Sequence, residues 1–391
     1  MTTRRQVTGR TWPVTAVLLL FFAGAGASLP TLPAAVREAG AGPTSLGVTL
    51  ALFPFAALAG RLVAGRLTDR RGRVLTLRLG LALTVAAGLV LALDGRVTDS
   101  SVAAIGAGRA LHGLADALLY TAASAYVLDR TPVDRRPQAL SLLGAAIWAG
   151  YALGPLVGAV LDLRQVGLVI AVGALLGLAV TRGLVESRVD GPRVTGARAL
   201  LPRGVALPGV TLGLGNLGYA AMVGFLVVHL DDRGGSGAVA LACFSVAVLL
   251  GRLLVVPLAA RVGILRTLPY ALVLMAAGLV VIGRTGDTVV AGLAAAVVGI
   301  GYCLPFPALA SLVAGRVPAS QRGAAIGALT GFYDLFVGAG SVVFGLLAAR
   351  SGTPAVFVLA AAGVLVAAAV DLAISRQERG ERVVADTAPD A

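Results

Sequence analysis

The sequence is dominated by apolar runs that follow one another along nearly its whole length, each long enough to cross a lipid bilayer. A helix needs about 20 apolar residues to cross the ~30 Å of hydrocarbon in a bilayer. Such runs lie, to within several residues, at 13–35, 44–64, 74–94, 101–127, 138–161, 166–183, 204–230, 238–260, 267–283, 287–313, 323–347 and 353–374. The sequence therefore predicts an all-α membrane protein with twelve transmembrane helices.

The composition excludes an ordinary soluble domain. Hydrophobic residues make up 58% of the chain and charged residues only 13%, whereas charged residues make up about 25% of soluble domains. The first apolar run follows Arg4, Arg5 and Arg10 as a signal peptide would, but it is too long and leads into further spans. We expect it to be retained as the first helix.

The charged and sulfur-containing residues exclude several classes of partner. The formal net charge is +13, but the arginines are spread over many short loops and form no single patch, so we expect no nucleic-acid partner. Cys243 and Cys303 both lie inside apolar runs, where neither a disulfide framework nor a metal site can be drawn. We expect no metal and no cofactor.

Loop arginines predict the orientation, because positively charged loops tend to stay in the cytoplasm. Breaks on the side of the N-terminus carry Arg66, Arg70, Arg71, Arg73, Arg130, Arg135, Arg136, Arg188, Arg193, Arg198, Arg203, Arg261, Arg266, Arg316 and Arg322. The opposite breaks carry Arg37, Arg96, Arg164, Arg233, Arg284 and Arg350. We therefore expect a multi-pass protein of the cytoplasmic (inner) membrane with both termini in the cytoplasm.

The two halves of the chain repeat each other in the same direction. "GRLVAGRLTDRRGR" at 60–73 can be laid over "GRLLVVPLAARVGI" at 251–264, and "DRTPVDRRPQAL" at 129–140 over "GRVPASQRGAAI" at 315–326. We expect two parallel six-helix bundles, with the substrate cavity between them. The predicted organisation is an N-terminal bundle at 1–183, a cytoplasmic linker at 184–203, a C-terminal bundle at 204–375 and a cytoplasmic tail at 376–391.

The charged loop "GRLTDRRGR" at 65–73 resembles the signature that the major facilitator superfamily carries between its second and third helices. Its form, G-x-L-a-D-r-x-G-r, is matched at Gly65, Leu67, Asp69, Arg70, Gly72 and Arg73. The resemblance covers essentially the whole chain and implies the major facilitator fold. Glycine permits a tight reversal, and Asp69 can accept bonds from nearby arginines or a helix N-terminus. We interpret the loop as a conformational latch; the alternative is that its arginines only set topology.

A second resemblance lies in the fifth predicted helix. "GYALGPLVGA" at 150–159 is similar to the G-x-x-x-G-P-x-x-G-G signature of antiporters in this superfamily, with matches at Gly150, Gly154, Pro155 and Gly158 and with Ala159 in place of the last glycine. The resemblance implies export. Small residues spaced by four also allow close helix packing alone, which is the alternative.

The fourth predicted helix carries a polar stripe. Arg109, His112, Asp116 and Tyr120 are spaced at i, i+3, i+7 and i+11 and so share one helix face. Ionisable groups at membrane depth are expensive, so we expect them to face a wet cavity or one another. Arg109 with Gly113 matches an arginine-glycine pair of the superfamily, which implies a part in proton coupling.

We infer the other members of the stripe from their chemistry. Asp116 is a candidate site where a proton and a cationic substrate compete; the alternative is an internal ion pair between Arg109 and Asp116. His112 is either a further proton-coupling residue or a packing residue. Asp334, near mid-membrane in the eleventh helix, is the second buried acid, for proton or substrate binding or for an interhelical hydrogen bond. We expect Tyr120, Asn216, Tyr219, Tyr302, Phe306 and Asp334 to line the substrate cavity.

Taken together, these features predict a proton-driven exporter rather than an enzyme. The substrate would be a small organic molecule, with antibiotics and other natural products as candidates. The alternative is a symporter or importer of a sugar, organic acid or siderophore. A membrane-embedded enzyme would need a loop-borne catalytic cluster, and a sensor would need a signalling domain; neither is evident. No nucleotide-binding loop is evident either. The expected partners are the substrate, protons and membrane lipids, and we expect a monomer.

Overall fold

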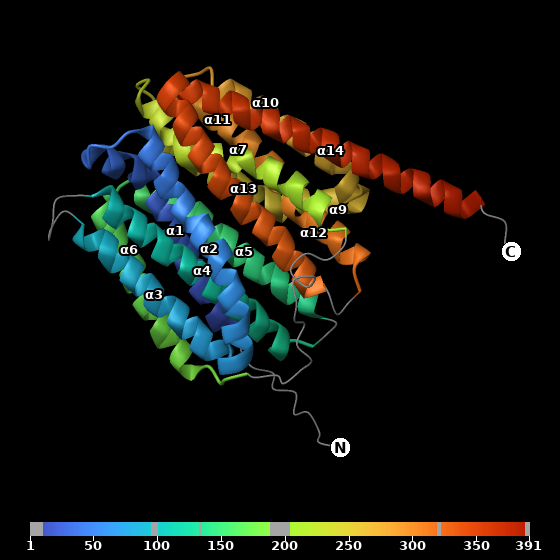
Figure 1. Cartoon of the computed structure of the whole chain (residues 1–391), viewed down its shortest axis with the longest axis horizontal. Helices are drawn as coiled ribbons and strands as arrows, with labels where there is room; N and C mark the ends of the chain where they lie inside the picture. The colour runs from blue at the N-terminus through green and yellow to red at the C-terminus, as the bar shows by residue number, and fades with distance from the viewer. Residues whose placement is uncertain (1–10, 95–100, 133–134, 188–203, 319–321, 388–391) are drawn as a thin grey trace.

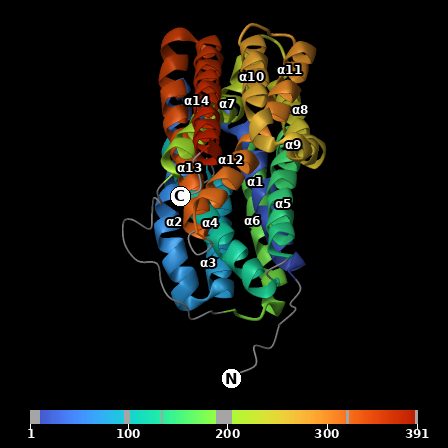
Figure 2. The same ribbon diagram turned by 90° about the vertical axis from the view of Figure 1, so that its right-hand side faces the viewer.

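The computed structural model describes residues 11–94, 101–132, 135–187, 204–318 and 322–387, and the regular secondary structure in these ranges is entirely helical. Most of the predicted linker at 184–203 lies outside these ranges. Figure 1 shows the first half of the chain, in blue to green, and the second half, in yellow to red, as two groups of helices that lie side by side. Figure 2 shows the same two groups after a quarter turn.

The first group consists of α1 (Trp12–Glu38), α2 (Pro43–Arg71), α3 (Arg73–Leu93), α4 (Val102–Arg130), α5 (Arg136–Gly158) and α6 (Leu163–Val180). The second consists of α7 (Ala206–Asp231), α8 (Gly237–Leu250), α9 (Val256–Val262), α10 (Ile264–Ile282), α11 (Thr288–Tyr302), α12 (Pro305–Arg316), α13 (Arg322–Ser351) and α14 (Thr353–Thr387). A π-helical turn at Gly251–Val255 joins α8 to α9. The helix α14 projects beyond the other helices towards the C-terminus (Figure 1).

The predicted membrane-spanning architecture is confirmed. Among the described residues, eleven segments are long and apolar enough to cross a membrane, counting α8–α9 and α11–α12 each as one, and α5 contributes a shorter apolar segment, Leu142–Gly158. The span expected as one helix at 287–313 is instead two helices that break at Cys303 and Leu304. Pro305 explains the break, because proline lacks an N–H and restricts the residue before it.

The repeat is visible in the backbone of the two halves. Gly72 separates α2 from α3 with φ of 110°, and the equivalent Gly263 separates α9 from α10 with φ of 112°. A side chain is strained in this left-handed region, so glycine permits the sharp reversal in both halves. The structure thus makes the same turn at both positions that the sequence overlay matched.

Among the described residues, the buried apolar contacts between the two groups are concentrated at one end. We call the end where α1 begins the N side and the end where α1 finishes the opposite side. The first-half members of the largest apolar cluster come from the opposite side and include Leu29, Leu32, Leu46 and Leu163. Those on the N side, including Val14, Leu18 and Tyr126, form a separate cluster within the first half. Among the described residues, buried apolar clusters therefore join the halves on the opposite side and not on the N side.

Close backbone contact between α2 and α13 completes this seal. A Cβ built on Gly345 would lie 2.8 Å from the Pro43 carbonyl oxygen and 2.9 Å from the Gly47 Cα. On the same side an ion pair joins Arg37 to Asp232 at 2.9 Å between the two halves. Two glycines thus let the helices touch without intervening side chains.

Candidate functional site

The polar stripe of α4 faces the interior of the protein. Arg109, His112 and Asp116 are 5%, 0% and 5% exposed, and Tyr120 is partly buried. These side chains lie between helices, as expected for ionisable groups in a membrane-spanning segment. Arg109 and Asp116 do not contact each other, however, and each has a partner on another helix.

The acid of the stripe pairs with an arginine from another helix. Arg61 on α2 donates from Nε to Asp334 Oδ2 at 2.7 Å and from Nη2 to Asp116 Oδ2 at 3.3 Å. Its guanidinium also lies 5.6 Å from the ring centre of Tyr120. One cation therefore holds a carboxylate of the first half and a carboxylate of the second.

The alternative ion pair between Arg109 and Asp116 is not formed. Arg109 instead donates from Nη1 to Ser28 Oγ at 3.1 Å, and its guanidinium lies 4.7 Å from the ring centre of Phe53. Its Nε has no hydrogen-bond partner. Arg109 is thus a buried cation that lacks a carboxylate partner in the described part of the chain.

His112 occupies an aromatic environment. Its ring packs edge-on against Phe21 and Phe53 at centroid distances of 4.6 and 5.6 Å, and neither ring nitrogen has a hydrogen-bond partner. Of the two roles expected for His112, these contacts favour packing over proton coupling.

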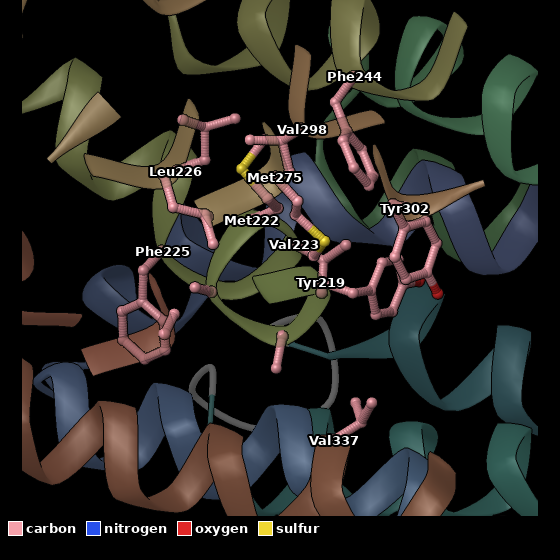
Figure 3. Packing of buried hydrophobic residues seen from close by; sticks show 14 of the residues in the cluster. Tyr219, Met222, Val223, Phe225, Leu226, Phe244, Met275, Val298, Tyr302 and Val337 are labelled. Carbon is pink, nitrogen blue, oxygen red and sulfur yellow. The ribbon is translucent and has the colours of Figure 1, made fainter. Parts of the chain in front are cut away.

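An aromatic cluster fills the space between the two halves. Tyr219 and Tyr302 stack with ring centres 5.1 Å apart and planes 11° apart, as Figure 3 shows. The ring centre of Trp148 lies 5.4 Å from that of Tyr302. The ring centres of Tyr151 and Tyr333 lie 6.5 and 6.2 Å from that of Tyr219. Two adjacent small cavities share Tyr151 and Tyr219 in their walls; Trp148 lines one, and Arg109 and Asp334 line the other.

The predicted cavity residues are only partly brought together. Tyr219, Tyr302 and Asp334 lie in this central region, and Tyr120 lies beside Arg61. Asn216 instead donates its amide to the Leu212 carbonyl of its own helix at 2.7 Å, and Phe306 packs against the apolar core on α12. Neither lines the two cavities.

Sequence reasoning missed Arg61 as the partner of the acids, and it missed Trp148, Tyr151 and Tyr333. Two signals were available. Two acids at membrane depth require a cation nearby, and Arg61 recurs as Arg252 in the repeat. Tyr333 is the neighbour of Asp334, and Tyr151 lies inside the glycine motif of α5.

The repeat relates the ion cluster to an aromatic site in the other half. The overlay of 60–73 on 251–264 matches Arg61 with Arg252. The overlay of 129–140 on 315–326, extended along the chain, matches Trp148 with Asp334 and Asp116 with Tyr302. Accordingly, Arg252 lies 4.1 Å from the ring centre of Trp148, as Arg61 lies beside Asp334. The positions equivalent to the two carboxylates around Arg61 thus hold aromatic rings around Arg252.

The charged loop makes its described contacts within the first half and with the start of the linker. Asp69, which is exposed, lies 3.6 Å from Arg73, and Arg73 also pairs with Asp129 of α4 at 2.9 Å. Glu186 accepts from the backbone N–H groups of Val74 and Leu75 and so caps α3. Around Gly65 there is open space. Among the described residues, no hydrogen bond or ion pair joins this loop to the second half, so the latch stays a prediction.

The glycine motif of α5 forms a tight contact with α1. A Cβ on Gly154 would lie 2.5 Å from the Ala23 carbonyl oxygen, and one on Gly150 would lie 2.7 Å from that of Leu19. A Cβ on Gly158 would likewise collide with the Ala27 carbonyl oxygen, and one on Gly26 would lie against the ring of Pro155. The motif therefore brings two helices of the same half into backbone contact.

This contact predicts a strong position dependence for alanine substitutions in α5. We expect Gly154→Ala to destabilise the protein by about 1–3 kcal/mol, because backbone atoms of α1 must move to make room. Gly144→Ala is the matched control, since a Cβ there meets nothing within 4 Å. Thermal unfolding of both variants in detergent checks this; equal midpoints would contradict the contact.

Comparison with known proteins supplies the family. The Major Facilitator Superfamily model matches residues 14–282 and 209–390. An uncharacterised MFS-type transporter of Burkholderia mallei (strain SAVP1) is 30% identical over 363 residues, which are 90% of this chain and 87% of that protein. An uncharacterised MFS-type transporter of Pseudomonas aeruginosa (strain UCBPP-PA14) is 29% identical over 94% of both chains.

Solved structures share the fold at low sequence identity. A D-xylose-proton symporter superimposes with a TM-score of 0.76 at 17% identity, covering 92% of this chain and 96% of that one. The human organic anion transporter MFSD10 (TETRAN) superimposes with a TM-score of 0.70 at 20% identity, covering 95% and 100%. With the family match and the apolar helices, these findings show that the chain is a multi-pass membrane transporter that belongs to the major facilitator superfamily.

Proposed function

We propose that the protein exports a small organic molecule across the cytoplasmic membrane in exchange for protons, by alternating access of a central cavity. The observation that carries the coupling is the ion cluster of Arg61, Asp116 and Asp334. Its carboxylates belong to different halves, so a change in the charge of Asp334 acts directly on the contact between the halves.

Proton binding has a simple consequence in this geometry. A protonated carboxyl loses most of its attraction for the guanidinium, so a proton on Asp334 weakens the link between α2 and α13. Asp116 then remains as the counter-ion of Arg61 within the first half. Proton arrival and departure would thus loosen and restore one bridge between the two halves.

Orientation and direction rest on separate observations. Loop arginines favour cytoplasmic termini, which makes the N side cytoplasmic and the structure open towards the cytoplasm. Export follows from the resemblance of the α5 motif to that of antiporters. Antibiotics are candidate substrates, so a role in antibiotic resistance is part of the proposal. Monomeric function and contact with lipid on the outer helix faces complete it.

The test is transport into inside-out membrane vesicles with an acidified interior. We expect the wild type to concentrate a substrate inside and to dissipate the pH gradient as it does so, and we expect Asp116→Asn to abolish both. Asn keeps the shape of the side chain but carries no charge, so Arg61 would have no counter-ion in the first half when Asp334 is protonated, and the bridge could not be released. Movement of substrate out of the vesicles, in the same direction as the protons, would instead establish the symporter or importer alternative.

Proton-coupled transport that is unchanged in Asp116→Asn would remove Asp116 from the mechanism. Asp162→Asn is a suitable control, because Asp162 caps the N-terminus of α6 away from the cavity, and asparagine keeps that cap. The roles in proton coupling that we expected for Arg109 and His112 can be measured in the same vesicles with Arg109→Gln and His112→Gln.

A further inference from the structure

We propose that the central cavity binds an organic anion with a flat apolar body, that Arg109 in the cavity wall holds its acidic group, and that Arg252 beside Trp148 adds to the positive charge around the ligand. This inference rests on the proposed transport function and specifies its substrate class. It assigns Arg109 to substrate binding rather than to proton movement.

The charges at the centre of the protein do not balance. Arg61 takes both carboxylates of the ion cluster. Arg109 contacts the Ser28 hydroxyl and the ring of Phe53, and Arg252 contacts the ring of Trp148. Within the described ranges neither of these two arginines has a carboxylate at ion-pair distance, and the Nε of each is buried without a partner. Positive charge is therefore in excess beside the cavity.

The excess favours an anionic ligand. Arginine stays protonated in proteins, and a guanidinium without a counter-ion is costly away from water. A carboxylate, phosphate or similar acidic group supplies the missing charge and matches the planar fork of guanidinium donors. A cationic ligand would add to the excess, so the expectation of a cation at Asp116 is disfavoured by the pairing with Arg61.

The walls of the cavities describe the body of the ligand. Arg109 shares a cavity with Tyr151 and Tyr219, and these two tyrosines continue into the cavity lined by Trp148. Arg252 lies over Trp148, and the ring centre of Trp148 lies 5.4 Å from that of Tyr302. Tyr302 stacks on Tyr219 (Figure 3). A flat ring can stack on these surfaces. Because Arg109 and Tyr151 belong to the first half and Tyr219 to the second, a ligand in these cavities would contact both halves.

Three probes with one shared body test this assignment: 4-nitrobenzoate, 4-nitrobenzyl alcohol and 4-nitrobenzylammonium. They carry negative, zero and positive charge, and nitroaromatic rings quench tryptophan fluorescence on contact. The chain has two tryptophans, so Trp12→Phe leaves Trp148 as the only reporter. Binding is titrated with the purified full chain in detergent, at equilibrium and without a proton gradient.

We expect saturable quenching by 4-nitrobenzoate, with an affinity at least about tenfold higher than that for the other two probes. Arg109→Gln should weaken binding of 4-nitrobenzoate by about tenfold or more, as loss of a charge-assisted hydrogen bond does. Arg252→Gln should weaken it less, and both variants should leave binding of the neutral probe unchanged. Arg164→Gln, which changes an exposed arginine of α6, is the control and should bind as the wild type.

The proposal is overturned if 4-nitrobenzoate fails to quench saturably, if the neutral or cationic probe binds as tightly, or if both glutamine variants keep the wild-type affinity. If a variant does not fold, the comparison of the three probes on the wild type decides. Because binding is measured without a gradient, its failure leaves proton coupling untouched, and loss of coupling in vesicles leaves the binding result untouched.

Discussion

Replacing Arg61 with glutamine is expected to abolish transport and to lower the free energy of unfolding by roughly 3–5 kcal/mol, the range for breaking a buried ion pair. The variant leaves Asp116 and Asp334 buried, 5% and 3% exposed, without the cation that both contact. The two acids then either remain charged at a high cost or stay protonated. In both cases the proton can no longer control the bridge between the halves.

A set of variants separates stability from coupling. The triple variant Arg61→Gln, Asp116→Asn and Asp334→Asn removes every charge of the cluster, so we expect it to regain most of the lost stability, because replacing all members of a buried pair is often near neutral. It should still transport nothing in a proton-dependent manner. Arg164→Gln, exposed on α6, should match the wild type in both assays. Thermal unfolding and vesicle uptake measure the two effects.

If Arg61→Gln alone unfolded at the wild-type temperature, the cluster would not stabilise the contact between the halves. If it also kept proton-driven uptake, Arg61 would have no part in coupling.

The sequence predicted the helices of this protein well, because apolar length is a local property. Each span needs only its own residues to cross the bilayer. The departures also have local causes: Pro305 breaks the tenth span, and the eighth span contains the π-helical turn Gly251–Val255. The first was readable from the sequence; we have no physical account of the second.

The pairing of charges was not predictable in the same way. Helical spacing correctly places Arg109, His112 and Asp116 on one face of α4, and all three are buried. It does not say which neighbouring helix supplies a partner. Arg61 on α2 reaches both Asp116 on α4 and Asp334 on α13 only because α2 packs between α4 and α13. That arrangement is a property of the tertiary structure. The repeat was the available clue, since it set Arg61 opposite Arg252.

The seal on the opposite side gives the second large effect. We expect Gly345→Val to prevent the closed state seen here and to abolish transport, because the new side chain would collide with Pro43 and Gly47 on α2. Alternating access requires each side to close in turn, so a protein that cannot close one side cannot complete the cycle. Gly327→Val on the same helix is the matched control, since a Cβ there meets nothing within 4 Å.

Chemical labelling distinguishes a trapped conformation from simple unfolding. Ser341 lines the cavity that contains Arg109 and is 2% exposed. In a background of Cys243→Ser and Cys303→Ser, an introduced Ser341→Cys should react slowly with a membrane-impermeant maleimide applied from the opposite side, and much faster once Gly345→Val is added. A folded Gly345→Val protein with slow labelling and normal transport would show that α2 and α13 need not touch here, and the sealed side would then depend on the ion pair of Arg37 and Asp232 and on the apolar cluster instead.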